Sequence, residues 1–169
     1  MLMVSCMFMK KFKLIDLNRS LIQQAKKASI DAVWGDYFSE AEKIPNAVLI
    51  TASNPKWTFG GGIDLGFYNH FYSECREKQE KGGGMERIGN IVFAITVNEE
   101  YKSTPEIVKQ ALEFGLSTLK KNETLVTSAL GTGIGGLPTD IFIEIIKDLS
   151  PESWENKRLR SLEWFEQLV

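Results

Sequence analysis

The chain has few of the side chains that build disulfide frameworks, metal centres and histidine-dependent active sites. Its 169 residues include two cysteines, Cys6 and Cys75, too few for the disulfide framework of a small secreted domain. His70 is the single histidine of the sequence, so no cluster has the ligand spacing of a structural zinc site, and we expect no metal. Its surroundings, "FYNHFY", are more typical of a helix face than of a catalytic pair.

Long hydrophobic runs and a strong charge of one sign are also lacking. No apolar stretch approaches the ~18 residues of a membrane span, and the lysines of the apolar start "MLMVSCMFM" follow it, unlike those of a signal peptide. Twenty basic and 22 acidic residues argue against nucleic acid or a membrane as a partner. We expect a soluble, cytoplasmic protein with a disordered N-terminal extension at 1–10 and a single domain at 11–169.

Apolar patterns predict strands that alternate with helices. Near-continuous apolar runs at 46–51 and 90–97 are typical of strands covered on both faces in a parallel sheet. Helical spacing extends over 63–80, and Thr104-Pro105 is a helix start. Further strands are expected at 11–17, 30–34 and 123–130, and further helices after Asn18, after Pro138 and from Ser150. This order predicts an α/β fold with a mainly parallel sheet.

Three of the predicted strands end in loops with unusual chemistry. They are Gly35-Asp36, "ASNPKWTFGGGID" after the third strand and "GTGIGGLP" after the last. In parallel sheets, ligands bind beyond the carboxyl ends of strands. Glycine-rich loops that lead into helices offer unpaired N–H groups and a positive helix end, which together suit phosphates. The alternative is that these glycines only form turns.

The late loop, Gly131 to Gly136, contains the spacing G-x-G-x-x-G of dinucleotide-binding proteins. That motif alone is weak, because the dinucleotide fold needs a further strand and 33 residues remain after the loop. A Walker loop is excluded, since neither glycine loop ends in Gly-Lys-Ser/Thr. A nucleotide-dependent redox or transfer enzyme therefore stays an alternative.

Asn54 and Asp64 bracket the first glycine loop. A carboxamide can bond sugar hydroxyls, and a carboxylate at a helix start can accept from ribose or orient a water. Taken alone, each residue is better explained as a local turn or cap residue than as a catalyst, and Asp36 has the same two explanations.

Gly35-Asp36, "ITASNPKWTFGGGID" and "SALGTGIGGLP" together resemble the macro domain family, whose members bind ADP-ribose. The family signature is Gly-Asp-Ile-Thr, Val-Asn-Ala-Ala-Asn, a glycine run with Val-Asp, and a late Ser-Thr-Gly-Ile-aromatic-Gly-x-Pro. The matching pieces occur here in that order between Ile30 and Leu149. The forms "LIDLN" and "ALGTGIGG" are similar to the branch found in bacteriophage and prophage genomes. The resemblance implies a three-layer α/β/α sandwich with a mixed, mainly parallel sheet.

The resemblance also implies ligand contacts, with ADP-ribose or a derivative as the ligand, ADP-ribosylated protein as a partner, and no cofactor. Asp36 would accept from the adenine amino group, and Tyr37 would offer its backbone N–H. Asn54 and Asp64 would act at the distal ribose, Asp64 by orienting a water. The other implied ligand-binding residues belong to the glycine loops: Ser53, Gly60, Gly61, Gly62, Ile63, Gly131, Thr132, Gly133, Ile134, Gly135 and Gly136.

Departures from the signature bear on catalysis. Thr51 replaces the first asparagine, Gly131 the late serine and Gly135 the aromatic, while Tyr68 stands where some hydrolytic relatives have a histidine. An ADP-ribose-binding macro domain that also hydrolyses mono-ADP-ribosyl protein or ADP-ribose 1''-phosphate is the leading hypothesis. A non-catalytic phage or prophage structural or recognition module is the second. These departures make hydrolysis less secure than binding.

Overall fold

The structure is a computed structural model that describes residues 11–149. The predicted extension at 1–10 and the predicted helix from Ser150 lie outside the described residues. The elements are β1 (Lys11–Asp16), α2 (Arg19–Lys27), β2 (Ala32–Trp34), α3 (Tyr37–Ala41), β3 (Ala47–Ile50), α4 (Gly62–His70), α5 (Tyr72–Lys81), β4 (Glu86–Ile88), β5 (Ile91–Phe93), α6 (Pro105–Ser117), β6 (Thr124–Thr127) and α7 (Thr139–Leu149).

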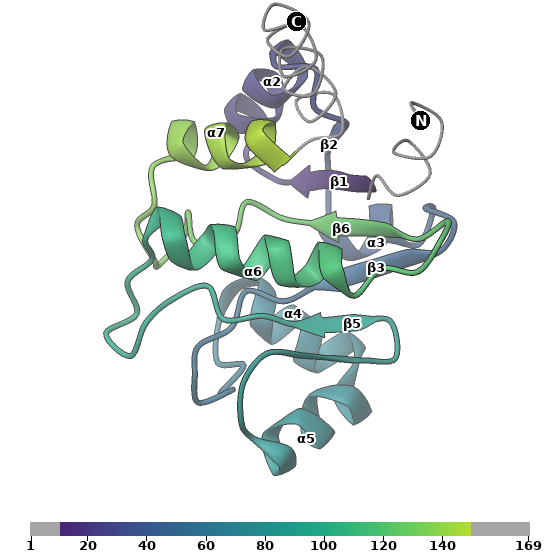
Figure 1. The fold of residues 1–169 in the computed structure, drawn as a ribbon, viewed down its shortest axis with the longest axis vertical. Coiled ribbons are helices and arrows are strands. Elements are labelled where there is room, and N and C mark those ends of the chain that lie inside the picture. Colours follow the sequence, from purple (N-terminus) through teal and green to yellow (C-terminus); the bar gives the residue numbers. More distant parts are fainter. Residues whose placement is uncertain (1–10, 150–169) are drawn as a thin grey trace, which may run out of the picture.

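The six strands form one mixed, mainly parallel sheet in the order β2-β1-β6-β3-β5-β4. All neighbouring pairs are parallel except β4 with β5. Helices α2, α6 and α7 pack on one face and α3, α4 and α5 on the other, each set enclosing its own apolar cluster. Figure 1 shows this sandwich with α6 and α7 in front of the sheet. The expected three-layer α/β/α fold is confirmed.

Local sequence explains most helix starts. Asn18 caps α2 by accepting from the Leu21 N–H at 3.1 Å, and Thr104 caps α6 by accepting from the Ile107 N–H at 3.2 Å. Pro105 occupies the first turn of α6, where its missing N–H costs nothing. Both helices begin where the sequence predicts.

The single helix predicted over 63–80 is wrong, because the structure contains two helices, α4 and α5. Phe71 leaves the helical conformation, with φ −132° and ψ 55°. Hydrogen bonds from Phe71 N to Phe67 O and from Cys75 N to Phe71 O nevertheless continue on either side. The spacing of apolar residues is therefore unbroken across the bend. At the bend, Phe71 packs against neighbouring aromatic rings, and the sequence pattern does not show this contact.

Two short elements were not expected. Helix α3 has five residues and begins directly after Asp36. Strand β4 has three residues and pairs with β5 across a tight turn in which Gly89 has φ +57°. The Gly89-Asn90 dipeptide is a hairpin signal, but three half-buried residues at a sheet edge give no alternating pattern.

Arg87 and Glu123 form a two-pronged ion pair at the amino end of β6. Arg87 Nη1 and Nη2 donate to the two Glu123 carboxylate oxygens at 2.8 and 2.7 Å, and Nη1 also donates to the Thr118 carbonyl. Each side chain is only 15% exposed. The hydrogen bonds from Arg87 lower the pKa of Glu123 to about 2.

We expect Glu123→Gln to lower the free energy of unfolding at pH 7 by ~1.5–3 kcal/mol, because a charge-assisted pair is lost. A carboxyl group whose pKa is lower in the folded state stabilises the fold at pH values above its ordinary pKa. This contribution disappears as pH falls from about 4.5 towards 2. Urea unfolding of both proteins at pH 7, 4 and 3 should therefore show a difference that shrinks with acidity. A constant difference would contradict the assignment.

Candidate functional site

The site lies at the edge where the parallel strands end. Because β6 lies between β1 and β3, the loops that follow β3 and β6 leave the sheet side by side. Asp16, the last residue of β1, reinforces this edge, since its Oδ2 accepts from the Ala129 N–H at 3.0 Å. The topology therefore brings the two glycine loops together, as the sequence predicts.

The glycines of these loops fall into two groups. A Cβ on Gly60, Gly61 or Gly133 would meet no heavy atom within 4 Å, and none of the three has a positive φ. Gly62 and Gly136 also have open surroundings, but their φ values of +58° and +72° themselves favour glycine. Neither turn geometry nor internal packing thus accounts for glycine at 60, 61 and 133.

Gly131 and Gly135, by contrast, are required by packing within the protein. A Cβ on Gly131 would lie 2.4 Å from Ser103 Oγ, and one on Gly135 would lie 2.8 Å from the Gly131 carbonyl oxygen. Ser103 N also donates to the Gly135 carbonyl at 2.9 Å. An aromatic side chain at 135 would not fit this packing, which explains the departure from the family signature.

Backbone N–H groups remain unpaired in both loops. Among residues 11–149, no hydrogen bond is found from the N–H of Gly133, Ile134 or Gly135, nor from that of Gly61. The N–H groups of residues 62–64, in the first turn of α4, also have no partner within the described part of the chain, because Gly61 at the N-cap has no capping side chain. These donors, together with the positive end of the nine-residue α4, suit an anion.

The expected ligand residues Ile134 and Thr132 differ in exposure. Ile134 is 84% exposed at the tip of the late loop. Thr132 is half-buried, and its Oγ1 donates to the Ala129 carbonyl at 2.8 Å. Ile63 is likewise half-buried, in the first turn of α4.

Asp36 is exposed and caps α3. Its Oδ2 accepts from the Ser39 N–H at 2.9 Å, and this hydrogen bond lowers the pKa of Asp36. The local cap role is therefore present, and the carboxylate keeps further acceptor positions. The following residue, Tyr37, points into the core, where its hydroxyl donates to the Val126 carbonyl and accepts from the Ile50 N–H.

Asn54 is engaged within its own loop. Its Oδ1 accepts from the Lys56 N–H at 3.0 Å, and its Nδ2 donates to Thr58 Oγ1 at 2.7 Å. The side chain is therefore held in one orientation at the carboxyl end of β3. One amide hydrogen and one acceptor position remain for a ligand.

Asp64 is a buried carboxyl group in the first turn of α4, with 5% of its surface exposed. It is not the helix cap. Its Oδ1 accepts from Ser53 Oγ at 2.8 Å, and no hydrogen bond to its Oδ2 is found among the described residues. Burial raises the pKa of Asp64 to about 7, and the Ser53 hydroxyl only partly offsets this shift.

A chain of hydroxyl groups connects Asp64 to the sheet. Ser53 Oγ lies 2.8 Å from Thr51 Oγ1 as well as from Asp64, and Thr51 Oγ1 accepts from the Ala94 N–H at 3.0 Å. Ser53 is fully buried, so its side chain faces Asp64 rather than solvent. Thr51, at the position where the macro domain signature has its first asparagine, is the second link of this chain.

Two aromatic residues of the first loop have unusual backbones. Trp57 and Phe59 have φ values of 55° and 51°, and both side chains are 2% exposed. The left-handed conformation costs a non-glycine residue ~1–2 kcal/mol, so the surrounding packing must hold it. Nothing in the sequence pattern predicts these conformations.

His70 and Cys75 do not belong to the strand-end site. His70 is stacked on Phe38 at 4.4 Å between ring centroids, in keeping with the expected helix-face role. Cys75 is fully buried, and this burial raises the pKa of its thiol to about 12. Such a thiol is a poor nucleophile.

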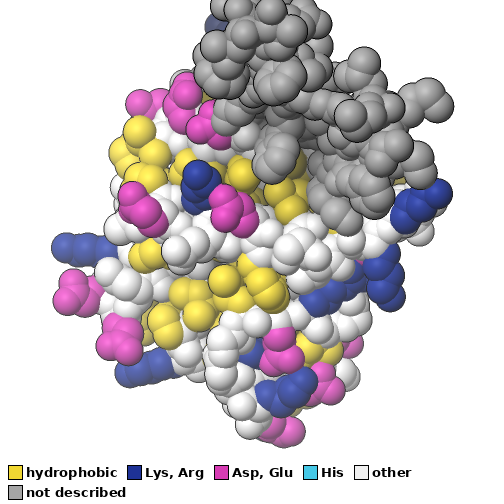
Figure 2. All heavy atoms as spheres, viewed as in Figure 1, with side chains coloured by type: hydrophobic (Ala, Val, Ile, Leu, Met, Phe, Trp, Pro, Cys, Tyr) yellow, Lys and Arg dark blue, Asp and Glu magenta, His cyan; other side chains and the backbone are white. Residues whose placement is uncertain are grey.

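Within 11–149, no group of three or more His, Cys, Asp or Glu side chains is arranged to hold a metal ion. No helix in the same range is long and apolar enough to cross a membrane. Acidic and basic side chains are both distributed over the face formed by α6 and α7 (Figure 2).

The sequence matches no protein-family model and no curated protein. Among solved structures, the macrodomain of DarG from Mycobacterium tuberculosis is similar. The two chains share 18% identity with a TM-score of 0.57, over 69% of this chain and 86% of that one. This similarity concerns the arrangement of the backbone, since so few residues are shared.

Proposed function

We propose that this chain, which has a macrodomain fold, binds ADP-ribose at the carboxyl edge of its sheet. The observation that carries the proposal is the set of glycines at 60, 61 and 133. Neither their backbone angles nor their neighbours require glycine, whereas close approach of a ligand to the backbone would. The unpaired N–H groups beside them suit a diphosphate.

In this proposal, the two halves of the ligand lie on either side of the diphosphate. The exposed Asp36 carboxylate accepts from the adenine amino group, and the Tyr37 backbone N–H bonds the ring. Asn54, at the end of β3, bonds the distal ribose beside Asp64. Gly131 and Gly135 pack against Ser103 and hold the loop in shape, and the unpaired N–H of Gly135 is one of the donors to the diphosphate.

Titration calorimetry with ADP-ribose, NAD, AMP and buffer tests the proposal. We expect ADP-ribose to bind most tightly, because it alone combines the adenine, the diphosphate and a free distal ribose. Tighter binding of NAD would favour the nucleotide-dependent enzyme. Among residues 11–149, however, no strand follows the G-x-G-x-x-G loop, as that enzyme class would need.

We expect Asp36→Ala to weaken ADP-ribose binding by roughly ten- to a hundredfold. A hydrogen bond to a charged group contributes ~1.5–3 kcal/mol, which converts to that range of affinity. Calorimetry measures the change. Asp36→Ser is the matched variant, because serine still caps α3 but does not extend to the adenine. Equal affinity of Asp36→Ser and the wild type would contradict the adenine contact.

A further inference from the structure

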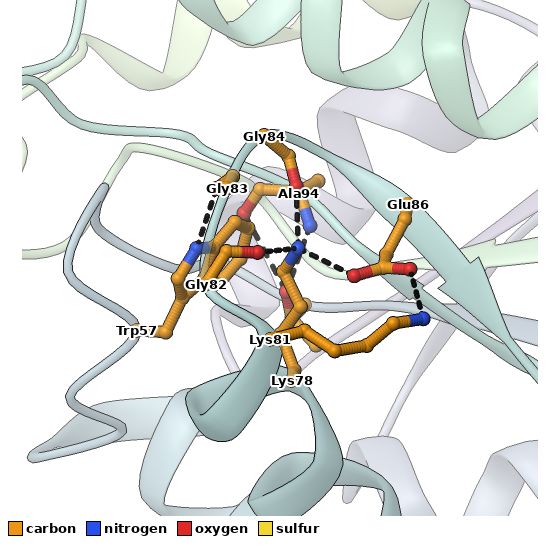
Figure 3. A network of polar contacts seen from close by, with 9 residues as sticks. Trp57, Lys78, Lys81, Gly82, Gly83, Gly84, Glu86 and Ala94 are labelled. Carbon is orange, nitrogen blue, oxygen red and sulfur yellow. Dashed lines mark hydrogen bonds and ion pairs between the residues drawn. The ribbon is translucent and has the colours of Figure 1, made fainter.

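Lys78 of α5 is a fully buried lysine with every donor occupied. Its side chain is 1% exposed, and its ammonium donates to the Gly82 carbonyl at 2.8 Å, the Gly84 carbonyl at 2.5 Å and Glu86 Oε1 at 2.7 Å. Figure 3 shows the ammonium at the centre of these contacts. A lysine has three N–H donors, so Lys78 has none left for a ligand.

The same network fixes Trp57, which belongs to the loop between β3 and α4. The Lys78 ammonium lies 4.7 Å from the centroid of the Trp57 ring, and Trp57 Nε1 donates to the Gly83 carbonyl at 2.9 Å (Figure 3). The Trp57 carbonyl accepts from Gln79 Nε2 at 3.1 Å. Three contacts from α5 and the turn after it therefore hold one loop residue.

The glycine turn at 82–84, between α5 and β4, provides the carbonyl groups that hold both Lys78 and Trp57. The carbonyls of three successive glycines at 82–84 point alternately to Lys78 and to Trp57. Gly82 and Gly83 have φ values of +60° and +78°, which allow this tight path. Glu86 balances the buried charge, and its hydrogen bond from Lys78 is the main cause of its lowered pKa.

We infer that Lys78 is a positioning residue, which holds the 54–61 loop in the conformation that the ligand requires. The loop contains two bulky residues in the left-handed conformation, Trp57 and Phe59, so it would relax without external support. The far end of this loop is formed by Gly60 and Gly61. The inference rests on the proposed function, because it assigns Lys78 a role in the affinity for the diphosphate ligand.

Lys78→Met tests the inference, with Lys81→Met as the matched control. Methionine keeps most of the volume of lysine and removes the ammonium. Lys81 bonds the same Glu86 at 2.9 Å, but its side chain is 55% exposed and does not contact Trp57. Hydrogen–deuterium exchange of the ligand-free proteins reports loop order at 54–61, and calorimetry reports ADP-ribose affinity.

We expect Lys78→Met to accelerate exchange at 54–61 while the amides of β1 and β6 stay protected. If the competent loop is populated one-tenth of the time, the dissociation constant rises about tenfold. Lys81→Met should change neither quantity. Unchanged exchange in Lys78→Met, or a mobile loop with wild-type affinity, would overturn the inference.

Two further results separate the inference from the proposed function. If the wild type binds no ADP-ribose while Lys78→Met loosens the loop, the proposed function fails and the positioning role loses its ligand but not its structural basis. If Lys78→Met does not fold, Trp57→Leu replaces it. Leucine keeps an apolar side chain and removes both the ring that the Lys78 ammonium contacts and the hydrogen bond to Gly83. Wild-type loop exchange and affinity in Trp57→Leu would then overturn the inference.

Discussion

Gly61→Glu and Gly133→Glu are each expected to abolish measurable ADP-ribose binding while the protein stays folded. A glutamate at either position places a side chain and a negative charge where the backbone should meet phosphate. The fold should tolerate both changes, because a Cβ there meets no atom within 4 Å and φ is not positive. Calorimetry measures the affinity, and circular dichroism with thermal unfolding measures the fold.

Gly84→Glu is the matched control for this pair. Gly84 is also exposed, its φ is not positive, and its Cβ would meet nothing within 4 Å. It lies between α5 and β4, outside the two glycine loops that follow β3 and β6. Gly84→Glu keeps the backbone carbonyl that accepts from Lys78, so it should bind like the wild type. Tight binding by Gly61→Glu or Gly133→Glu would mean that the loop concerned only forms a turn.

The alternation of elements was predictable because buried strands and amphipathic helices have different apolar periods. The runs at 46–51 and 90–97 contain β3 and β5, and both strands are covered on their two faces. The order of the strands within the sheet was harder to predict from the sequence. The position of β6 between β1 and β3 depends on crossovers that the local pattern does not encode.

The errors in the prediction occur where tertiary packing overrides local pattern. The bend at Phe71 separates α4 from α5 without interrupting the spacing of apolar residues. The edge strand β4 is too short to show the alternation of apolar and polar residues that marks a strand. Gly66 shows the same limit, because a Cβ there would lie 2.5 Å from the Phe38 ring, a contact between α4 and α3.

The candidate site could be predicted in part, because glycine loops and their flanking polar residues are visible in the sequence. Which glycines face outward was not visible, since Gly131 and Gly133 differ in their backbone angles and in what packs against them, and the sequence shows neither. The buried role of Ser53 also depends on Asp64, eleven residues away. The contact between Lys78 and Trp57 joins helix α5 to the loop after β3 across 21 residues of sequence, so no motif indicates it.

We propose that Asp64 acts as an acid–base group rather than as a structural acid. A structural carboxylate is usually paired with a cation or with several N–H donors, which lower its pKa. Asp64 has one hydroxyl partner among the described residues, and burial raises its pKa to about 7. A group that titrates near neutral pH can take a proton from a water and release it again.

The same burial makes a prediction about stability. A carboxyl group with a raised folded-state pKa stabilises most below its ordinary pKa of 3.8, and this contribution is lost as pH rises through about 7. Asparagine does not titrate and has nearly the same shape as aspartate. Asp64→Asn should therefore be more stable than the wild type at pH 8, with a smaller advantage at pH 5. Urea unfolding at both values measures the difference.

Asp64→Asn is also expected to lose most hydrolytic turnover, by ~10²–10⁴-fold, while its affinity for ADP-ribose changes little. In the proposed reaction, water attacks C1'' of the distal ribose as the bond to the acceptor breaks. The acceptor leaves as its anion, and Asp64 takes the proton of the water. The readouts are release of ADP-ribose from mono-ADP-ribosyl protein and release of phosphate from ADP-ribose 1''-phosphate. Both proteins are compared at equal folded concentration.

Ser53→Ala distinguishes a role of Asp64 in turnover from its contribution to stability as a buried group. It removes the hydroxyl that bonds Asp64 and should raise the pKa of Asp64 further, because that hydrogen bond is what lowers it. The lower pH limit of turnover should then move upward, whereas Asp64→Asn loses turnover at every pH. Turnover that survives Asp64→Asn would remove Asp64 from the mechanism. A wild type that binds ADP-ribose without turnover would make the protein a reader of ADP-ribosylation, with Asp64 contributing only to its pH-dependent stability.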